Sequence, residues 1–376
     1  MKYWVLILVA LILSGCSRGR TIPVEHIEDS DACSEITHAR GFTLSSTADG
    51  DVTLVDISDP QGKNTQVFHF ALVPRDKDAA VPDGYVKIQV PVERVICMTS
   101  LQLSNFILLD QLDRVSGITS TRHLFNPDMK RRLADGRVHK IGIEGNFDNE
   151  VILAVDPELI LISPFKRGGY DALRDIGVPL MPHLGYKELD PLGQAEWIKL
   201  IGLLTGTTQQ ADSAFAAIES RYDSLKTLAM SATERPKVFC GEFKSGNWYA
   251  QGGKSFLATL FTDAGADYFL HDNNESGGVT LDFETLYSMA HDADYWRLVN
   301  SHKGDYTYEI LKAEDSRYAD FKAYRDSGVI YCNMTQVPFY EAMPVEPDQV
   351  LADFIHVFHP ELLPDHKPRF YSLLKK

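Results

Sequence analysis

Residues 207–230 read TTQQADSAFAAIESRYDSLKTLAM, and no glycine or proline interrupts them. Thr207 followed by Gln210 fits a capping box, in which each side chain satisfies a backbone N–H at a helix start. Apolar residues then recur every three or four positions, which places them on one stripe of a helix. The stripe consists of Ala211, Phe215, Ile218, Tyr222, Leu225 and Ala229. Such a helix would be roughly 33 Å long, about the width of a small domain.

The sequence on both sides of this helix alternates between buried strands and short helices. Strand-like runs before it are residues 95–99, 115–118, 139–143, 159–163 and 178–181, and those after it are residues 237–241, 248–250, 293–298 and 329–332. The helices expected between and after them are 101–112, 149–155, 171–176, 256–264, 283–290, 317–324 and 348–358. This alternation favours parallel sheets. We therefore predict an α/β protein of two Rossmann-like lobes with parallel sheets joined by one long interlobe helix, the alternative being an ordinary surface helix of one domain.

The predicted boundaries follow changes in composition along the chain. They are a lipoprotein signal peptide with lipobox at 1–16, a polar tether at 17–40, an N-terminal lobe at 41–185, interlobe helices at 186–232 and a C-terminal lobe at 233–376. Strand and turn signals fill residues 41–92, so the N-terminal lobe should begin with a small antiparallel β appendage, followed by its α/β part at 93–185.

The N-terminus reads MKYWVLILVALILSGC. Lys2 is followed by an apolar run that is too short for a spanning helix and suits a signal peptide. The small residues before Cys16 resemble a bacterial lipobox. The resemblance implies diacylation of Cys16, which would place the protein outside the inner membrane, in the periplasm or at the cell surface, anchored to the membrane by lipid. A plain signal peptide with an incidental cysteine is the alternative.

Bulk properties exclude several classes of protein. The net charge of −15 argues against nucleic acid as a partner, because nucleic acid requires a basic surface. Cys33, Cys97, Cys240 and Cys332 form no CxxC motif, so a zinc site is not expected, and Cys97 and Cys240 read as buried thiols. Hydrolase, zincin, P-loop and dinucleotide motifs are absent from the sequence, which favours a protein that is not an enzyme and holds no cofactor.

Five phrases in order around the long helix resemble one family. They are RVICMTSLQLSNFILLDQLDRVSGITS at 94–120, KIGIEGNFDNEVILAVDPELILI at 140–162, WYAQGGKSF at 248–256, LDFETLY at 281–287 and VLADFIHVFHP at 350–360. They resemble the helical-backbone (class III) substrate-binding proteins of ABC importers, which serve ferric siderophores, haem and cobalamin. The resemblance covers the chain from Arg94 onward. It implies an ABC transporter permease as partner, an iron-siderophore, haem or corrinoid ligand, and a rigid interlobe helix.

The resemblance also implies two contacts with the permease. In this family a glutamate on each lobe engages permease arginines, and the matching residues here are Glu150 and Glu284. Both should lie in the first turn of a helix, where the macrodipole favours a carboxylate and Arg can bind it in a bidentate fork. The alternative is that both are ordinary acids at helix starts.

The ligand should bind between the lobes, where residues follow the carboxyl ends of strands. The candidates are Thr99, Ser100, Arg122, His123, Phe165, Lys166, Arg167 and Tyr186 in the first lobe, and Trp248, Tyr249, Trp296, Arg297, Phe339 and Tyr340 in the second. Aromatic rings suit flat or apolar ligand faces, and the cations can pair with carboxylate or catecholate oxygens. Core packing remains the alternative for the aromatics, and a solvated loop charge for the cations.

Other functions also stay open at this stage. His123 could be an axial ligand if the cargo were haem, whereas His356 and His359 read as structural. An extracytoplasmic chelatase-like enzyme on the same two-lobed frame would require an acid and a base side by side in the cleft. A surface interaction lipoprotein would instead have a filled, apolar seam between its lobes.

Overall fold

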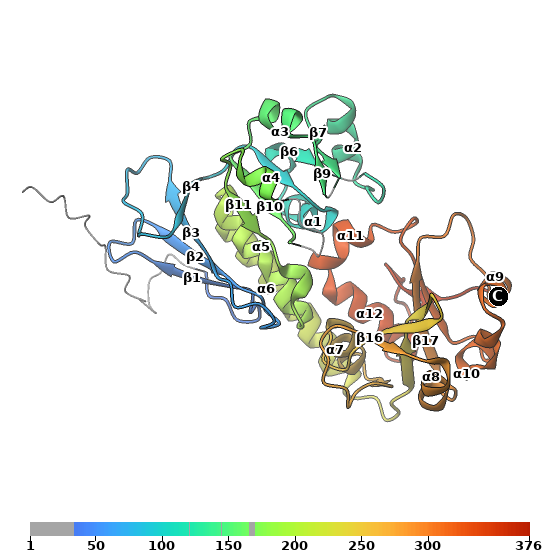
Figure 1. Ribbon diagram of the computed structural model, residues 1–376. Helices are drawn as coiled ribbons and strands as arrows, with labels where there is room; N and C mark the ends of the chain where they lie inside the picture. The colour runs from blue at the N-terminus through green and yellow to red at the C-terminus, as the bar shows by residue number, and fades with distance from the viewer. Residues whose placement is uncertain (1–33, 120, 144, 165–169) are drawn as a thin grey trace, which may run out of the picture.

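The computed structural model describes residues 34–119, 121–143, 145–164 and 170–376. One unbroken helix, α6 (Thr208–Ala229, 22 residues), runs from one α/β lobe to the other (Figure 1). Gly206 turns the chain from α5 (Pro191–Thr205) into α6, with a positive φ of 75° that glycine adopts without strain. Gly202 lets the two helices approach closely, because a Cβ there would lie 2.5 Å from the Cβ of Ala211. The predicted interlobe helix is confirmed.

The apolar stripe of α6 is buried as its spacing predicts. Ala211, Phe215, Ile218, Tyr222 and Ala229 are buried, and Leu225 packs against them from the edge. The predicted capping box is wrong. Thr207 makes no side-chain cap hydrogen bond, because the short turn at Gly206 places its hydroxyl 2.8 Å from the hydroxyl of Thr205.

The first lobe is built on a five-stranded parallel sheet in the order β11-β10-β5-β6-β7. Its strands are β5 (Val95–Cys97), β6 (Val115–Ile118), β7 (His139–Lys140), β10 (Leu159–Ile162) and β11 (Leu180–Pro182). A short hairpin, β8 (Gly142–Ile143) and β9 (Asn146–Phe147), precedes the third helix. The helices are α1 (Ser100–Leu108), η1 (Leu112–Arg114), α2 (Pro127–Ala134), α3 (Asn149–Val155), α4 (Asp171–Arg174) and η2 (Gly185–Lys187). The two central strands β5 and β10 consist of Val, Ile and Leu with one Cys, and are buried throughout, as is typical of a parallel sheet with both faces covered.

The second lobe repeats this plan with additions. Its main sheet has the order β15-β12-β17-β18-β19, parallel except for the last strand. These strands are β12 (Lys237–Cys240), β15 (Asp267–Tyr268), β17 (Tyr295–Asn300), β18 (Val329–Asn333) and β19 (Ser372–Leu373). A separate antiparallel sheet holds β13 (Glu242–Lys244), β14 (Asn247–Gln251) and β16 (Gly278–Leu281).

The helices of the second lobe largely follow the predicted segments. They are α7 (Phe256–Asp263), α8 (Phe283–Ala290), α9 (Tyr308–Glu314), η3 (Ser316–Asp320), α10 (Lys322–Arg325), α11 (Phe339–Ala342), η4 (Met343–Val345) and α12 (Pro347–Phe358). The prediction of a single helix at 317–324 is wrong. The segment is divided at Phe321, which is extended and fully buried against Trp248 and Trp296. No helix in the described part of the chain is long and apolar enough to cross a membrane.

The N-terminal appendage is a four-stranded sheet against α5, on the side away from the second lobe (Figure 1). Its strands are β1 (Phe42–Ser46), β2 (Thr53–Ile57), β3 (Phe68–Pro74) and β4 (Val86–Val90). The first three are antiparallel as predicted, but β4 runs parallel to β3, which corrects the expectation for the last strand. The cause is residues 75–85, which cross the outer face of the sheet, where Val81 and Tyr85 cover Leu54 and Val73.

Two buried carboxylates, Glu196 in α5 and Glu188 just after η2, bind the segment before β1. We call residues 37–41 with Glu188 and Glu196 the N-terminal clamp. Glu196 accepts hydrogen bonds from the backbone N–H groups of Thr37, His38 and Ala39 at 2.7–3.2 Å. The hydroxyl of Thr37 also donates to it, at 3.2 Å, and the ammonium group of Lys199 lies at 2.7 Å. Glu188 accepts from the N–H groups of Arg40 and Gly41 in the same way. The segment is therefore part of the folded lobe.

Candidate interlobe binding site

The two lobes meet at the carboxyl ends of their parallel strands. His123, in the loop after β6, lies against the second lobe: its Nδ1 is 3.2 Å from the carbonyl oxygen of Met334, directly after β18. Its ring also lies 5.3 Å from that of Tyr340, centroid to centroid. In open α/β sheets this edge is where ligands bind. The predicted position of the site, between the lobes, is therefore consistent with the way the sheets face each other.

Glu341 joins the lobes through a contact that the sequence did not indicate. This side chain of α11 is 3% exposed, and its Oε2 accepts hydrogen bonds from the N–H groups of Phe125 and Asn126, at 2.9 and 2.8 Å. Burial raises the pKa of the carboxyl group, against the opposing effect of the two N–H donors. In the sequence, Glu341 is one acid in a short helix, and only the fold brings the loop before α2 to it.

On the first-lobe side the site has a small polar cavity between β5, β10 and α5. It has a volume of about 10 Å³, room for about one water molecule, and Thr99 and Tyr186 lie at its wall. The oxygens Thr99 Oγ1, Asn105 Oδ1 and Gln194 Oε1 are buried there with no hydrogen-bond partner among the described residues. Burial lowers the pKa of His183, beside them, to about 4. This wall is therefore polar but uncharged at neutral pH.

On the second-lobe side lies a larger pocket, with a volume of about 190 Å³, at the ends of β12 and β17. Arg297 lines it, half-buried, and donates a hydrogen bond to the hydroxyl of Tyr371. Tyr249 forms the rim and is 44% exposed. We call this the Arg297 pocket. The sequence placed both residues among the ligand candidates.

The other candidates of the second lobe lie deeper than expected. Trp248 and Trp296 are fully buried, and their indole N–H groups donate to the carbonyl oxygens of Cys240 and Gly241 at 2.9 and 3.0 Å. Their rings are core side chains, so we do not retain them as ligand contacts. Phe339 is likewise buried and packs on Tyr340.

The remaining candidates of the first lobe are in part accessible. Ser100 is half-buried at the start of α1, and Arg122 is exposed in the loop after β6. Phe165, Lys166 and Arg167 lie outside the described residues, and so does Cys16.

The two glutamates expected to contact the permease occupy matching positions on the two lobes. Glu150 and Glu284 are both exposed in the first turn of their helices, α3 and α8. Each helix begins with an aspartate whose side chain accepts a backbone N–H, Asp148 from Val151 and Asp282 from Thr285. The local geometry is thus as predicted, while the contact itself remains a prediction.

Histidines and cysteines form no cluster for a metal in the described residues. No group of three or more His, Cys, Asp or Glu side chains there is arranged to hold an ion. His356 Nδ1 and His359 Nε2 lie 2.8 and 3.2 Å from the carbonyl oxygens of Leu363 and Gly265, in agreement with a structural role. Cys97, Cys240 and Cys332 are buried free thiols.

Comparison with known proteins agrees with this architecture. An uncharacterised lipoprotein of Methanocaldococcus jannaschii is 25% identical over 320 residues, which cover 79% of this chain and 74% of that protein. A periplasmic binding protein from Veillonella parvula superposes with a TM-score of 0.60 at 14% identity, covering 83% of this chain and 99% of its own. A periplasmic haem-binding protein from Pseudomonas aeruginosa gives a TM-score of 0.57 at 17% identity, covering 76% and 99%.

These structural likenesses establish the fold, and the sequence profile establishes the family. The profile of the periplasmic binding proteins matches residues 95–334, more than half of the chain. The match spans the first-lobe sheet, the parallel strands of the main second-lobe sheet and the whole of α6. With its two lobes, their facing strand ends and this match, the chain belongs to the periplasmic binding protein family.

Proposed function

We propose that this protein is the extracytoplasmic substrate-binding component of an ABC importer. It binds an iron complex, a ferric siderophore or haem, or else cobalamin, and delivers it to the permease. The observation that carries the proposal is the pair of α/β lobes whose strand ends face each other, joined by the unbroken helix α6. A ligand bound there touches both lobes, so the relative position of the lobes can report whether the site is loaded.

The proposed ligand contacts come from both lobes. Thr99, Ser100, Arg122, His123 and Tyr186 supply them in the first lobe, and Tyr249, Arg297 and Tyr340 in the second. Phe165, Lys166 and Arg167 are proposed on the sequence alone. The mixture of aromatic rings with cations suits a large complex that has both flat faces and anionic oxygens.

The proposed permease contacts are Glu150 and Glu284. Their exposure leaves both carboxylates accessible to arginines, and α3 and α8 belong to different lobes (Figure 1). A permease that binds both at once therefore senses the distance between the lobes. The proposed anchor is lipid on Cys16, which keeps the carrier at the membrane that holds the permease.

The test of delivery is charge reversal at both contacts. Glu150→Lys together with Glu284→Lys should reduce uptake of the cargo by cells about tenfold or more, because like charges juxtaposed at an interface cost several kcal/mol. Glu309→Lys is the matched control, since Glu309 is also an exposed acid in the first turn of a second-lobe helix. Uptake that is equal in the double variant and the control would remove the proposed docking mode.

The test of cargo is a titration of the purified protein with haemin, a ferric catecholate siderophore and cyanocobalamin, followed by visible absorption. Each of these is coloured, so transfer from water into the interlobe site should shift its spectrum. One of them is expected to bind with saturation at one equivalent. If none of the three saturates, the proposed class of cargo is wrong.

A further inference from the structure

Arg297, which is half-buried, differs from Lys199, the one Lys or Arg that is buried among the described residues. Lys199 is 7% exposed and is paired with Glu196 at 2.7 Å. Arg297 lies in β17 and, among the described residues, forms no ion pair; its one hydrogen bond is from Nη2 to the hydroxyl of Tyr371. Its Nε is buried and has no partner there. The Nε of the guanidinium group has thus lost water without gaining an acceptor, and the group has no counter-charge among the described residues.

The surroundings of Arg297 do not neutralise it. Tyr371 is fully buried, and burial raises the pKa of its phenol well above the usual range, so it meets Arg297 as a neutral hydroxyl. Glu242, the acid in the pocket wall, is paired with Lys244 at 3.2 Å. A guanidinium group remains charged at every physiological pH. Because an unpaired charge is costly to bury, this arrangement favours an anion that arrives from outside the chain.

The Arg297 pocket provides room for that anion at the edge of the sheet that faces the first lobe. Its volume is about 190 Å³, enough for a carboxylate arm or a compact oxyanion but too small for a whole siderophore or haem. β12 and β17 end at the pocket, and β18, the next strand in the sheet, ends at the contact between Met334 and His123. The pocket therefore opens on the same edge as the proposed interlobe site. Its other walls are Leu298, Val299 and Gln251.

We propose that the Arg297 pocket is an anion-binding subsite, which receives a carboxylate or another oxyanion group of the ligand. The planar fork of the guanidinium group can bind two oxygens of such a group at once. Tyr249 and Leu298 cover the adjoining carbon atoms, while the bulk of the ligand lies between the lobes. That this ligand is then delivered to a permease rests on the proposed function, whereas anion binding at Arg297 does not.

The core tryptophans provide a readout of the pocket. Trp248 and Trp296 donate to the backbone oxygens of Cys240 and Gly241, both in the pocket wall, so an anion bound beside them should change the intrinsic fluorescence. The wild-type protein is titrated separately with phosphate, a compact oxyanion, and with citrate, a tricarboxylate. The same titrations are made with Arg297→Met and with Arg235→Met, the control. Arg235 lies in the same lobe and donates to two carbonyl oxygens from its surface.

At least one of the two anions should bind the wild type and the control equally and bind Arg297→Met about 10- to 100-fold more weakly, the size expected for a lost charge-assisted hydrogen bond. Arg297→Lys keeps the charge but loses the fork, so it should fall between them. A preference for phosphate indicates a free oxyanion, and a preference for citrate indicates a carboxylate arm on a larger ligand.

Two results would overturn the subsite: equal affinities of the wild type and Arg297→Met, or no fluorescence response of the wild type to either anion up to about 10 mM, where even a single charge-assisted pair should be detected. Thermal unfolding confirms that Arg297→Met is folded. Its Tm should equal or exceed that of the wild type, because replacing an unpaired buried charge with an apolar side chain is often neutral or stabilising. Loss of anion binding with unchanged dependence of uptake on Glu150 and Glu284 separates the subsite from the delivery function.

Discussion

The N-terminal clamp and the Arg297 pocket both bury charge, but they treat it in opposite ways. In the clamp, Glu196 is fully buried, and three backbone N–H groups and Lys199 satisfy it. In the pocket, Arg297 has one neutral partner and an unsatisfied Nε. A buried charge whose partners are complete serves the fold, whereas one left incomplete is available to a ligand. The completeness of the partners, more than burial itself, distinguishes a structural from a binding residue.

The largest expected effect comes from removing the clamp carboxylate. Glu196→Ala leaves Lys199 buried without its partner and three N–H groups without an acceptor, so the free energy of unfolding should fall by about 3–5 kcal/mol. Urea unfolding followed by circular dichroism measures it. Arg297→Met in the same assay should show no loss. If both variants lose a similar amount, the distinction between complete and incomplete charges fails.

A smaller loss of stability is expected when a side chain is added at Gly41, in the backbone of the same clamp. A Cβ on Gly41 would lie 2.7 Å from the ring of Trp197 and 3.0 Å from Glu188 Oε1, too close for either neighbour to remain in place. Gly41→Ala should therefore lower the free energy of unfolding by about 1–3 kcal/mol, the usual cost of overpacking. Gly277→Ala provides the control, because φ there is not positive either and an added Cβ would meet only the flexible Lys63 ammonium group, at 3.6 Å. A cost at Gly41 no greater than that at Gly277 would show that the clamp tolerates displacement.

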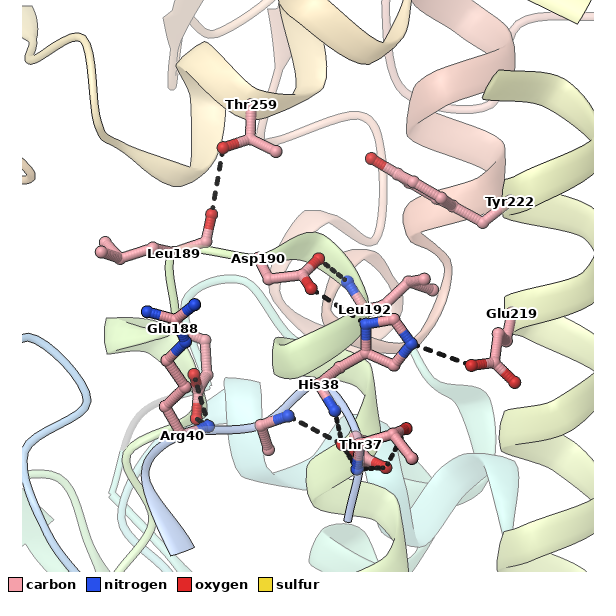
Figure 2. Close-up of polar contacts among 12 residues, drawn as sticks. Thr37, His38, Arg40, Glu188, Leu189, Asp190, Leu192, Glu219, Tyr222 and Thr259 are labelled. Carbon is pink, nitrogen blue, oxygen red and sulfur yellow. Dashed lines mark hydrogen bonds and ion pairs between the residues drawn. The ribbon is translucent and has the colours of Figure 1, made fainter. Parts of the chain in front are cut away.

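The smallest effect concerns the pH dependence of stability that arises from His38. Its Nδ1 lies 3.0 Å from Asp190 Oδ2, and its Nε2 lies 2.8 Å from Glu219 Oε1 (Figure 2). Burial by itself would lower the pKa of His38, but the hydrogen bonds to the two acids outweigh it and raise the pKa above 6.5. Because its pKa is higher in the folded state, protonated His38 stabilises the fold. This stabilisation is fully present below about pH 6.5 and is lost as pH rises through the pKa of the folded state.

As pH rises above about 6.5, the free energy of unfolding should thus decline more in the wild type than in His38→Gln. Parallel urea unfolding at several pH values measures the difference. Identical pH profiles for the two proteins would mean that His38 is not charged in the clamp.

The sequence predicted those parts of the molecule that depend on local periodicity. The helix at 208–229, the helices Asn149–Val155 and Phe283–Ala290, and the parallel strands of both lobes follow from apolar spacing and from the acids at the helix starts. The capping box at Thr207 could not be decided locally, because its hydroxyl is taken by Thr205 across the Gly206 turn.

The site could be predicted only in part, for a physical reason. Position after a strand selected Arg297 and Tyr249, which line a pocket, but it selected the core residues Trp248 and Trp296 equally. Alternation along a strand does not tell which face is covered by other elements. Phe239 of β12 packs on both tryptophans, and so does Phe321, which lies between η3 and α10. Glu341 and the clamp acids were missed because their partners are backbone N–H groups, which carry no sequence signal.

The N-terminal clamp also sets the length of the segment that would link the lipid on Cys16 to the folded lobe. Ser34 and His38 run alongside α6, through Asp212 and Glu219, so the chain is bound to the lobe from there onward. If Cys16 carries the lipid, as proposed, the stretch from 17 to 33 can reach at most roughly 60 Å at about 3.5 Å per residue. A carrier held within that radius experiences its permease at an effective concentration on the order of millimolar whenever the two are neighbours in the membrane. Even a weak docking contact would then suffice for transfer. After delivery, the empty carrier could leave the permease quickly and still remain at the membrane surface.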